Sequence, residues 1–129
     1  MTTPARWLGF AGEDLMLAQA ALQHDIPNQA CFHAQQGVEK ALKGFLRSRD
    51  RSVPKTHALT ELLTICRSLD ETFAQLEETC LKLDPYYVVT RYPDALPEAT
   101  SEGLPTRGEA EDAVTLLRAA LDWIKVKIR

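Results

Sequence analysis

The chain has 129 residues, of which 45% are hydrophobic and 26% are charged, and its formal net charge is −3. These values are typical of one soluble globular domain, so we expect residues 1–129 to form a single domain. The small negative charge argues against a protein whose whole surface is basic. No apolar run approaches the ~20 residues that span a bilayer, and no signal-peptide pattern is present, so we expect a cytoplasmic protein without membrane association.

The charges are unevenly distributed along the chain. Residues 39–55 carry six basic and two acidic side chains, a balance of +4. Residues 61–84 and residues 94–122 have balances of −4 and −5. The sequence therefore predicts one local basic surface on an otherwise acidic molecule.

Two amphipathic helices are predicted in the first third of the chain. The first covers residues 4–24, with Thr3 as its N-cap and Pro4 in its first turn. The second covers residues 28–49, with Asn28 as its cap, and places a polar stripe opposite its apolar face. That stripe contains His33, Gln36, Lys40, Lys43 and Arg47.

The rest of the chain predicts three further helical segments. A helix over residues 57–69 is expected to begin after a Thr56 cap, and the next begins at Asp70 and continues to about residue 84. Pro85 should kink or break that helix, leaving a short turn over residues 86–88. The prolines of residues 91–105 predict a loop. The last helix begins at a capping box formed by Thr106 and Glu109.

The absence of strand-like alternation makes an all-α fold the clear expectation. Amphipathic segments joined mostly by short connectors predict an antiparallel up-and-down helical bundle of four main helices plus one shorter or broken helix. The cysteines, Cys31, Cys66 and Cys80, fall on apolar stripes and form no CxxC pair, so we expect them to be buried and reduced.

Three segments resemble the HEPN family, named from higher eukaryotes and prokaryotes nucleotide-binding. Residues 30–43 read ACFHAQQGVEKALK, residues 54–59 read PKTHAL and residues 86–94 read YYVVTRYPD. An earlier element, Glu13-Asp14-Leu15 followed by Ala18, precedes them in the same order as in the family. The resemblance covers nearly the whole chain and implies a helical bundle that commonly dimerises.

The resemblance also implies several functions. Prokaryotic members often pair with a minimal nucleotidyltransferase as a toxin–antitoxin couple. Many members are metal-independent ribonucleases with an Arg-x(4–6)-His motif, and others keep the fold without this motif and are thought to bind nucleotides or RNA.

Arg51 and His57 match the spacing of that motif as Arg-x5-His. A histidine suits proton transfer near neutral pH, and an arginine can hold a phosphate with two parallel hydrogen bonds. His57 is predicted to lie at a helix N-terminus, which attracts phosphate. The alternative interpretation is structural: Thr56 caps the helix and His57 bonds to nearby backbone.

Two further groups are candidate ligand contacts. The polar stripe of His33, Gln36, Lys40, Lys43 and Arg47 can contact phosphate or a base, or can simply be solvated or form an interface. Tyr87, Arg91 and Tyr92 can stack on bases and grip a phosphate, or can pack the end of the bundle.

Three hypotheses follow for the function. The first is a nucleotide- or RNA-binding module that partners a nucleotidyltransferase, and the second is a metal-independent endoribonuclease using Arg51 and His57. The third is a structural adaptor. Other enzyme classes find no support, because the chain lacks a glycine-rich phosphate loop, a nucleophile elbow and an HExxH motif. We expect no metal and no cofactor.

Overall fold

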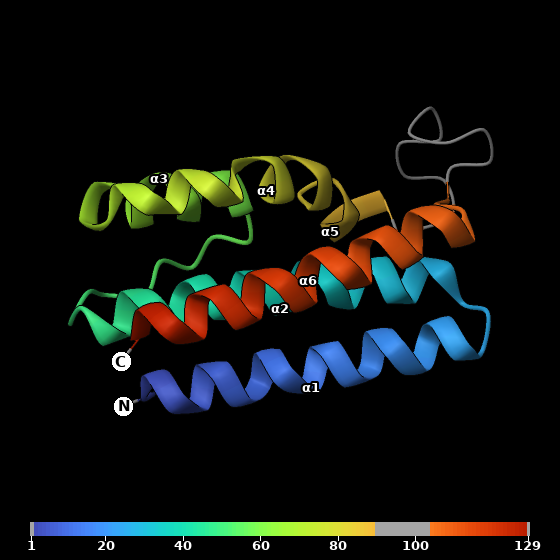
Figure 1. Ribbon diagram of the computed structural model, residues 1–129, viewed down its shortest axis with the longest axis horizontal. Coiled ribbons are helices and arrows are strands. Elements are labelled where there is room, and N and C mark those ends of the chain that lie inside the picture. Colours follow the sequence, from blue (N-terminus) through green and yellow to red (C-terminus); the bar gives the residue numbers. More distant parts are fainter. Residues whose placement is uncertain (1, 90–103, 129) are drawn as a thin grey trace.

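The structure of the protein, a computed structural model, describes residues 2–89 and 104–128. Regular structure within these residues is helical throughout, as predicted (Figure 1). The elements are α1 (Pro4–Gln23), α2 (Pro27–Ser48), α3 (Leu59–Leu69), the 3-10 helix η1 (Glu71–Leu76), α4 (Glu77–Leu83), α5 (Tyr86–Val89) and α6 (Arg107–Ile128).

Helices α1, α2 and α6 form the long part of the bundle (Figure 1). The α1 helix runs antiparallel to α2, and α6 lies against both. A glycine permits the close approach of α2 and α6, because a Cβ atom at Gly37 would lie 2.6 Å from the Leu117 Cδ1 atom. Buried hydrophobic side chains from all the long helices join in one continuous core.

The connector between α2 and α3 runs back along α2. The His57 backbone oxygen accepts a hydrogen bond from Gln35, and the Cys66 sulfur lies 3.8 Å from the Leu42 backbone oxygen. Residue numbers therefore increase together along the two helices, so α3 runs parallel to α2. The all-α bundle is confirmed. The connection between α2 and α3 departs from the strict up-and-down order of the helices, and it places His57 beside the middle of α2.

Several of the predicted helix caps are confirmed. The Thr3 hydroxyl accepts a hydrogen bond from the Arg6 backbone at the start of α1. The Asp70 carboxylate accepts one from the Thr72 backbone. Thr106 and Glu109 form the reciprocal capping box before α6, with bonds of 2.8 and 3.1 Å.

Two cap predictions were wrong. The α2 helix begins at Pro27, so Asn28 lies inside the first turn rather than at the N-cap. The α3 helix begins at Leu59 rather than at residue 57. Its first backbone amide donates to the Asp84 carboxylate at 2.8 Å. The Thr56 hydroxyl accepts from the Ala58 amide, before the helix, and donates to the Glu61 carboxylate in the first turn. A distant side chain therefore replaces the local cap that the sequence suggested.

The predicted helix over residues 70–84 is divided into η1 and α4. The predicted break at Pro85 is present, and the short α5 follows it. Cys31, Cys66 and Cys80 are buried in the core and form no disulfide. Among the described helices, none is long and apolar enough to cross a bilayer.

Candidate functional site

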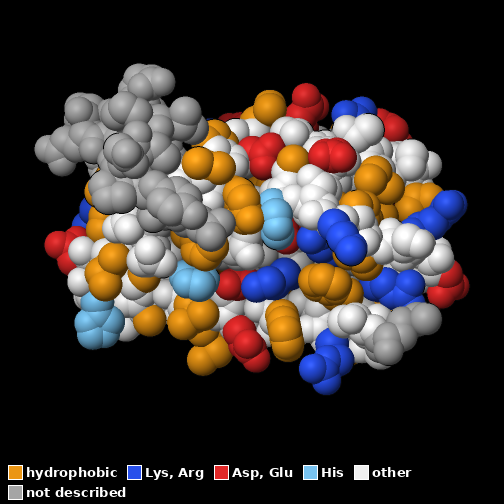
Figure 2. Space-filling view, turned by 180° about the vertical axis from the view of Figure 1, so that it is seen from behind, with side chains coloured by type: hydrophobic (Ala, Val, Ile, Leu, Met, Phe, Trp, Pro, Cys, Tyr) orange, Lys and Arg blue, Asp and Glu red, His pale blue; other side chains and the backbone are white. Residues whose placement is uncertain are grey.

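The polar stripe of α2 faces α1 and the returning connector. His33, Gln36, Lys40 and Lys43 follow the spacing that places residues on one side of a helix. The stripe is partly covered, since Lys43 is buried whereas His33, Gln36 and Lys40 are half-buried. Figure 2 views the molecule from behind relative to Figure 1, and it shows histidine, basic and acidic side chains close together near the centre of that face.

Asp14 of α1 is the centre of one polar cluster. It is only 3% exposed, and its two carboxylate oxygens accept from His33 Nδ1 at 2.9 Å and from Lys40 Nζ at 2.7 Å. A buried carboxylate is costly unless it is paired and hydrogen-bonded. The two donors on α2 satisfy this requirement and fix the position of α1 on α2.

Glu39 of α2 is the centre of a second cluster. It is also 3% exposed, and its oxygens accept from Lys43 Nζ at 2.9 Å, from His57 Nδ1 at 3.1 Å and from Gln36 Nε2 at 3.3 Å. The Lys43 side chain is almost fully buried. Its charge is therefore neutralised inside the protein, and it does not contribute an exposed cation to the surface.

The position of His57 is fixed by three contacts. Its backbone oxygen accepts from Gln35, its Nδ1 faces Glu39, and its ring stacks on that of Tyr87 with the centroids 4.4 Å apart. Tyr87 comes from α5, so this stack joins the connector to a later part of the chain. About half of the His57 side chain is exposed.

The two histidines share the same arrangement. In each, Nδ1 faces a buried carboxylate, which can only accept, so the proton on this nitrogen is directed at the carboxylate. The Nε2 atom of neither ring has a hydrogen-bond partner among the described residues. Phe32 packs edge-on against His33 and lies 6.5 Å from Tyr87, so aromatic rings connect the two histidines.

Arg51 and His57, the predicted pair, are placed apart. Arg51 borders a surface hollow of about 520 Å³ together with Ile65 and Leu69, at the C-terminal end of α3. His57 lies just before the N-terminal end of this helix, which is about 16 Å long at 1.5 Å per residue. No contact joins the two side chains in the described part of the chain.

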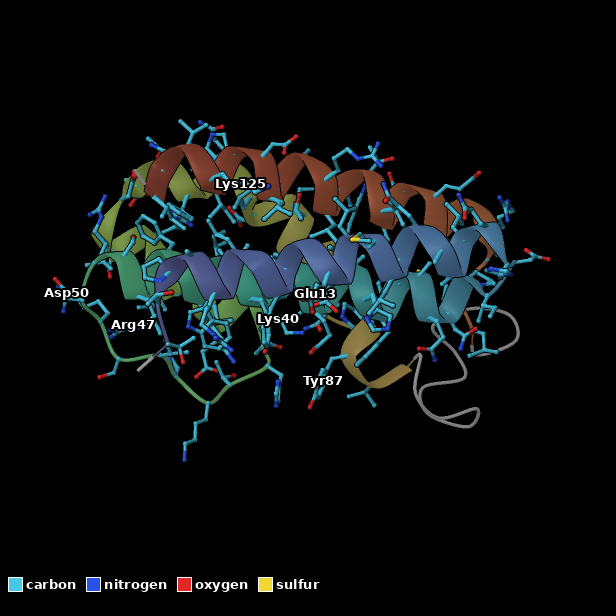
Figure 3. All side chains as sticks on the ribbon, turned by 90° about the horizontal axis from the view of Figure 1, so that it is seen from below. Glu13, Lys40, Arg47, Asp50, Tyr87 and Lys125 are labelled. Atoms are coloured by element: carbon cyan, nitrogen blue, oxygen red, sulfur yellow. The ribbon has the colours of Figure 1, made fainter. Side chains whose placement is uncertain are left out.

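Arg47 ties the start of the chain to the beginning of the connector. Its guanidinium donates to the backbone oxygens of Thr2 and Arg51, each at 3.2 Å. Figure 3 shows Arg47 near the end of α2 at which Asp50 turns the chain, whereas Lys40 and Tyr87 lie together near the middle of the molecule. The predicted contacts Arg91 and Tyr92 lie outside the described residues.

The cysteines take no part in this site. Burial raises the pKa of the thiols of Cys31, Cys66 and Cys80 to about 12. These thiols therefore stay protonated and unreactive near neutral pH. Within residues 2–89 and 104–128, no group of three or more His, Cys, Asp or Glu side chains is placed to hold a metal ion.

The two carboxylates are the site residues that sequence reasoning missed. Asp14 lies between Ala11 and Ala18 on the apolar face of α1, where an acidic residue is unusual. Glu39 follows the buried Val38 on α2. An acidic residue on a buried face is a signal for a buried ion pair, and it was available in the sequence for Asp14.

Comparison with family models decides the family. The model of the HEPN domain matches residues 5–127, which is almost the whole chain. The chain belongs to the HEPN domain family.

Solved structures of similar proteins agree with this assignment. The HEPN bundle is similar to TT1696 from Thermus thermophilus, with 36% identity, a TM-score of 0.84, and coverage of 98% of this chain and 99% of the other. It is also similar to ST0689, an archaeal HEPN homologue, with 28% identity, a TM-score of 0.80 and full coverage of both chains. No curated protein matches the chain.

Proposed function

We propose that this HEPN protein is a nucleotide- or RNA-binding module whose ligand site is the surface formed by His33, Lys40, His57 and Tyr87. The observation that carries the proposal is a pair of histidines, each oriented by a buried carboxylate, of which Asp14 also binds Lys40. Family membership supports a function related to nucleotides or RNA in general.

The chemistry of these groups suits a phosphate. The outward nitrogen of each ring donates a hydrogen bond when the ring is protonated, and the ammonium of Lys40 adds a third donor. Because Asp14 and Glu39 hold the side chains in place, little conformational entropy is lost when a ligand binds. Gln36 and Lys43 take supporting roles in this proposal, since both bond to Glu39. Arg47 lies at the end of α2, where it bonds to Thr2 and Arg51, so it is left out of the proposed surface.

The aromatic rings suit a base. Tyr87 and His57 already form a stack that a nucleobase can extend, and stacking on aromatic side chains does not require a particular base. The predicted contributions of Arg91 and Tyr92 to this part of the site remain predictions.

The proposal is tested by fluorescence anisotropy with a labelled single-stranded RNA and with ATP. We expect the wild-type protein to bind at low salt. We expect Lys40→Ala and His57→Ala each to weaken binding about tenfold, the size of one charge-assisted contact. The thermal midpoint of each variant is measured to separate loss of binding from loss of folding.

Lys125→Ala is the matched control, because it removes an exposed lysine of α6 that lies outside the site. Its affinity should equal that of the wild type. Wild-type protein that binds neither RNA nor ATP at low salt would overturn the proposal and favour a structural adaptor.

A metal-independent endoribonuclease is the second candidate, and the Glu39–His57 contact favours it. A buried carboxylate that orients a histidine is the arrangement used in general-base catalysis, and in-line attack by a ribose 2′-hydroxyl needs such a base. Arg51 remains the proposed phosphate contact for this reaction. Lys40 is the alternative cation, because it shares Asp14 with His33, whereas Arg51 lies at the other end of α3 from His57.

Incubation of the protein with RNA in EDTA tests this candidate. Cleavage that disappears in His57→Ala would establish the activity. Loss in Arg51→Ala with retention in Lys40→Ala would assign the cation to Arg51, and the opposite result would assign it to Lys40. Intact RNA after incubation with wild-type protein would rule the reaction out.

The homodimer and a minimal nucleotidyltransferase partner, as in toxin–antitoxin couples, are further parts of the proposal. Both are supported by the family rather than by a contact in this chain. Coexpression with a nucleotidyltransferase encoded beside this protein should give one complex on gel filtration. Separate elution of the two proteins would contradict the partnership.

A further inference from the structure

A surface hollow of about 520 Å³ lies between the connector and the C-terminal end of α3. It is lined by apolar side chains, Pro54, Ile65 and Leu69, and by the polar side chains Asp50, Arg51 and Ser68. Figure 3 shows Asp50 at one end of the molecule, whereas Lys40 and Tyr87 lie near its middle. The hollow is therefore separate from the ligand site proposed above.

The positive charges on the segment that lines this hollow are not neutralised. Arg49, Arg51 and Lys55 are exposed, and none of them forms an ion pair with another described residue. By contrast, Lys40 and Lys43 of the same basic segment are bound to buried carboxylates. The uncompensated charge of the segment is therefore concentrated on the connector.

Most acidic side chains near this hollow already have partners. Asp70 pairs with Lys127 at 3.2 Å, and Glu71 pairs with Arg67 at 2.7 Å. Asp50 is the exception, since it is exposed and forms no ion pair within the described part of the chain. Residues 49–55 thus carry three basic side chains and one acidic one, a balance that is complementary to an acidic partner.

Two further features favour a polypeptide over a nucleic acid as that partner. Among the described residues, no backbone hydrogen bond involves residues 52–55, so these backbone groups are available to an extended peptide. None of the described residues that line the hollow is aromatic, so the hollow offers no ring on which a base could stack.

We infer that the hollow binds an acidic segment of a partner protein. This segment places one large apolar side chain against Ile65 and Leu69. Its carboxylates pair with Arg49 and Arg51. An apolar side chain that fills a pocket within a polar rim is the usual anchor of a protein interface. The inference goes beyond the proposed ligand site, does not depend on it, and gives Arg51 a role that does not require His57 beside it.

Phage display of short random peptides on the immobilised full-length protein tests the inference. We expect the enriched peptides to share a large apolar residue flanked by Asp or Glu. Ser68→Glu serves as the counter-selection, because it adds a negative charge to the lining of the hollow at an exposed position. This variant should not retain the enriched peptides.

Fluorescence anisotropy with the most enriched peptide measures the effect of charge. Ser68→Glu should weaken binding about tenfold and Ser68→Lys should strengthen it, since both new side chains are long but their charges are opposite. Arg51→Ala should also weaken binding about tenfold. Asp50→Asn should strengthen binding about twofold, because it removes the acidic group of the lining and asparagine tolerates the φ of 57° at this position.

Thr64→Glu is the matched control for Ser68→Glu. Both residues are exposed on α3, one turn apart, and each hydroxyl donates to a backbone oxygen of this helix. Thr64 does not line the hollow, so Thr64→Glu should leave the peptide affinity unchanged. The thermal midpoint of each variant checks that it folds.

Four results would overturn the inference. They are a selection that enriches no peptide, enriched peptides without acidic residues, equal effects of Ser68→Glu and Thr64→Glu, and an RNA affinity that falls in Ser68→Glu. The last result would assign the hollow to nucleic acid. Wild-type protein that binds the acidic peptide but neither RNA nor ATP would overturn the proposed function alone.

Discussion

At the scale of single residues, two buried carboxylates organise the site. Asp14 and Glu39 each accept hydrogen bonds from a histidine and a lysine. Buried charges are tolerated only when their partners are present, so these residues combine a structural role with the orientation of the histidines. The sequence showed the cations of this surface, and the structure shows what holds them.

Glu39→Ala should lower the free energy of unfolding by about 3–5 kcal/mol, because it leaves the Lys43 ammonium buried without its partner. Urea denaturation measures the change. Glu78→Ala is the control, since Glu78 is 80% exposed and pairs only with Lys82 among the described residues, and it should cost less than about 1 kcal/mol. A loss below about 1 kcal/mol for Glu39→Ala would show that Lys43 finds another partner.

The buried thiols predict a loss of stability in alkaline solution. Burial raises the pKa of Cys31, Cys66 and Cys80 from 9.0 to about 12 in the folded state. Their contribution to stability is therefore fully present below pH 9 and is lost as the pH rises from 9 to about 12. Urea midpoints at increasing pH should fall over this range, and they should fall less in a variant with all three cysteines changed to alanine.

At the scale of helices and connectors, the returning segment before α3 decides where His57 lies. Because this segment runs back along α2, the start of α3 meets Asp84 rather than its own Thr56. The Asp84 carboxylate also accepts from the Thr60 hydroxyl at 3.0 Å. The helix that follows His57 is thus held from the far end of α4.

Asp84→Ala should destabilise the protein by about 1–2 kcal/mol, the usual cost of removing a helix cap. Thr56→Ala should have a smaller effect, because Thr56 lies before the helix. Chemical denaturation of both variants distinguishes the two caps. A larger loss for Thr56→Ala would restore the local cap predicted from the sequence.

Gly37→Ala should destabilise the contact between α2 and α6. The added methyl group would overlap with Leu117, and overpacking of this kind typically costs about 1–3 kcal/mol. Gly12→Ala on α1 is the matched control, since nothing lies within 4 Å of its Cβ position, and it should stabilise the protein by up to about 1 kcal/mol. Thermal unfolding that ranks the two variants in the opposite order would contradict this packing.

At the scale of the whole molecule, residues 39–55 present less positive charge at the surface than the residue count of this segment indicates. Glu39 lies inside it and neutralises Lys43, and Asp14 of another helix neutralises Lys40. The local balance of +4 therefore does not become four exposed positive charges on one face. This reduces the electrostatic part of any interaction with nucleic acid.

The salt dependence of RNA binding should accordingly be shallow. A slope of log affinity against log salt no steeper than about −1.5 corresponds to about two phosphate contacts on a single strand. Anisotropy titrations at several salt concentrations measure it. A slope of about −3 would mean about four contacts and would show that further basic side chains of the segment meet the ligand.

Local patterns predicted most of the fold. The limits of α1, α2 and α6 follow from hydrophobic periodicity, and the caps at Thr3, Asp70 and Thr106 are bonds between near neighbours in the chain. The break at Pro85 follows from its missing amide hydrogen. These features depend on a few adjacent residues, which is why one sequence is enough to predict them.

The candidate site was predicted in part. Sequence placed His33 and Lys40 on one stripe of α2, and the structure agrees. The sequence spacing paired Arg51 with His57, whereas the folded connector places these residues at opposite ends of α3. Spacing in a segment without regular structure does not determine distance in space, because each backbone bond there can turn the chain.

The sequence by itself determined the helical class, most helix boundaries, the buried cysteines and the polar stripe of α2, because each depends on periodicity or on contacts between near neighbours. Only the tertiary structure decided that α3 runs parallel to α2, that Asp14 and Glu39 neutralise the stripe, and that His57 stacks on Tyr87. These contacts join residues far apart in the chain, and packing of the whole bundle brings them together.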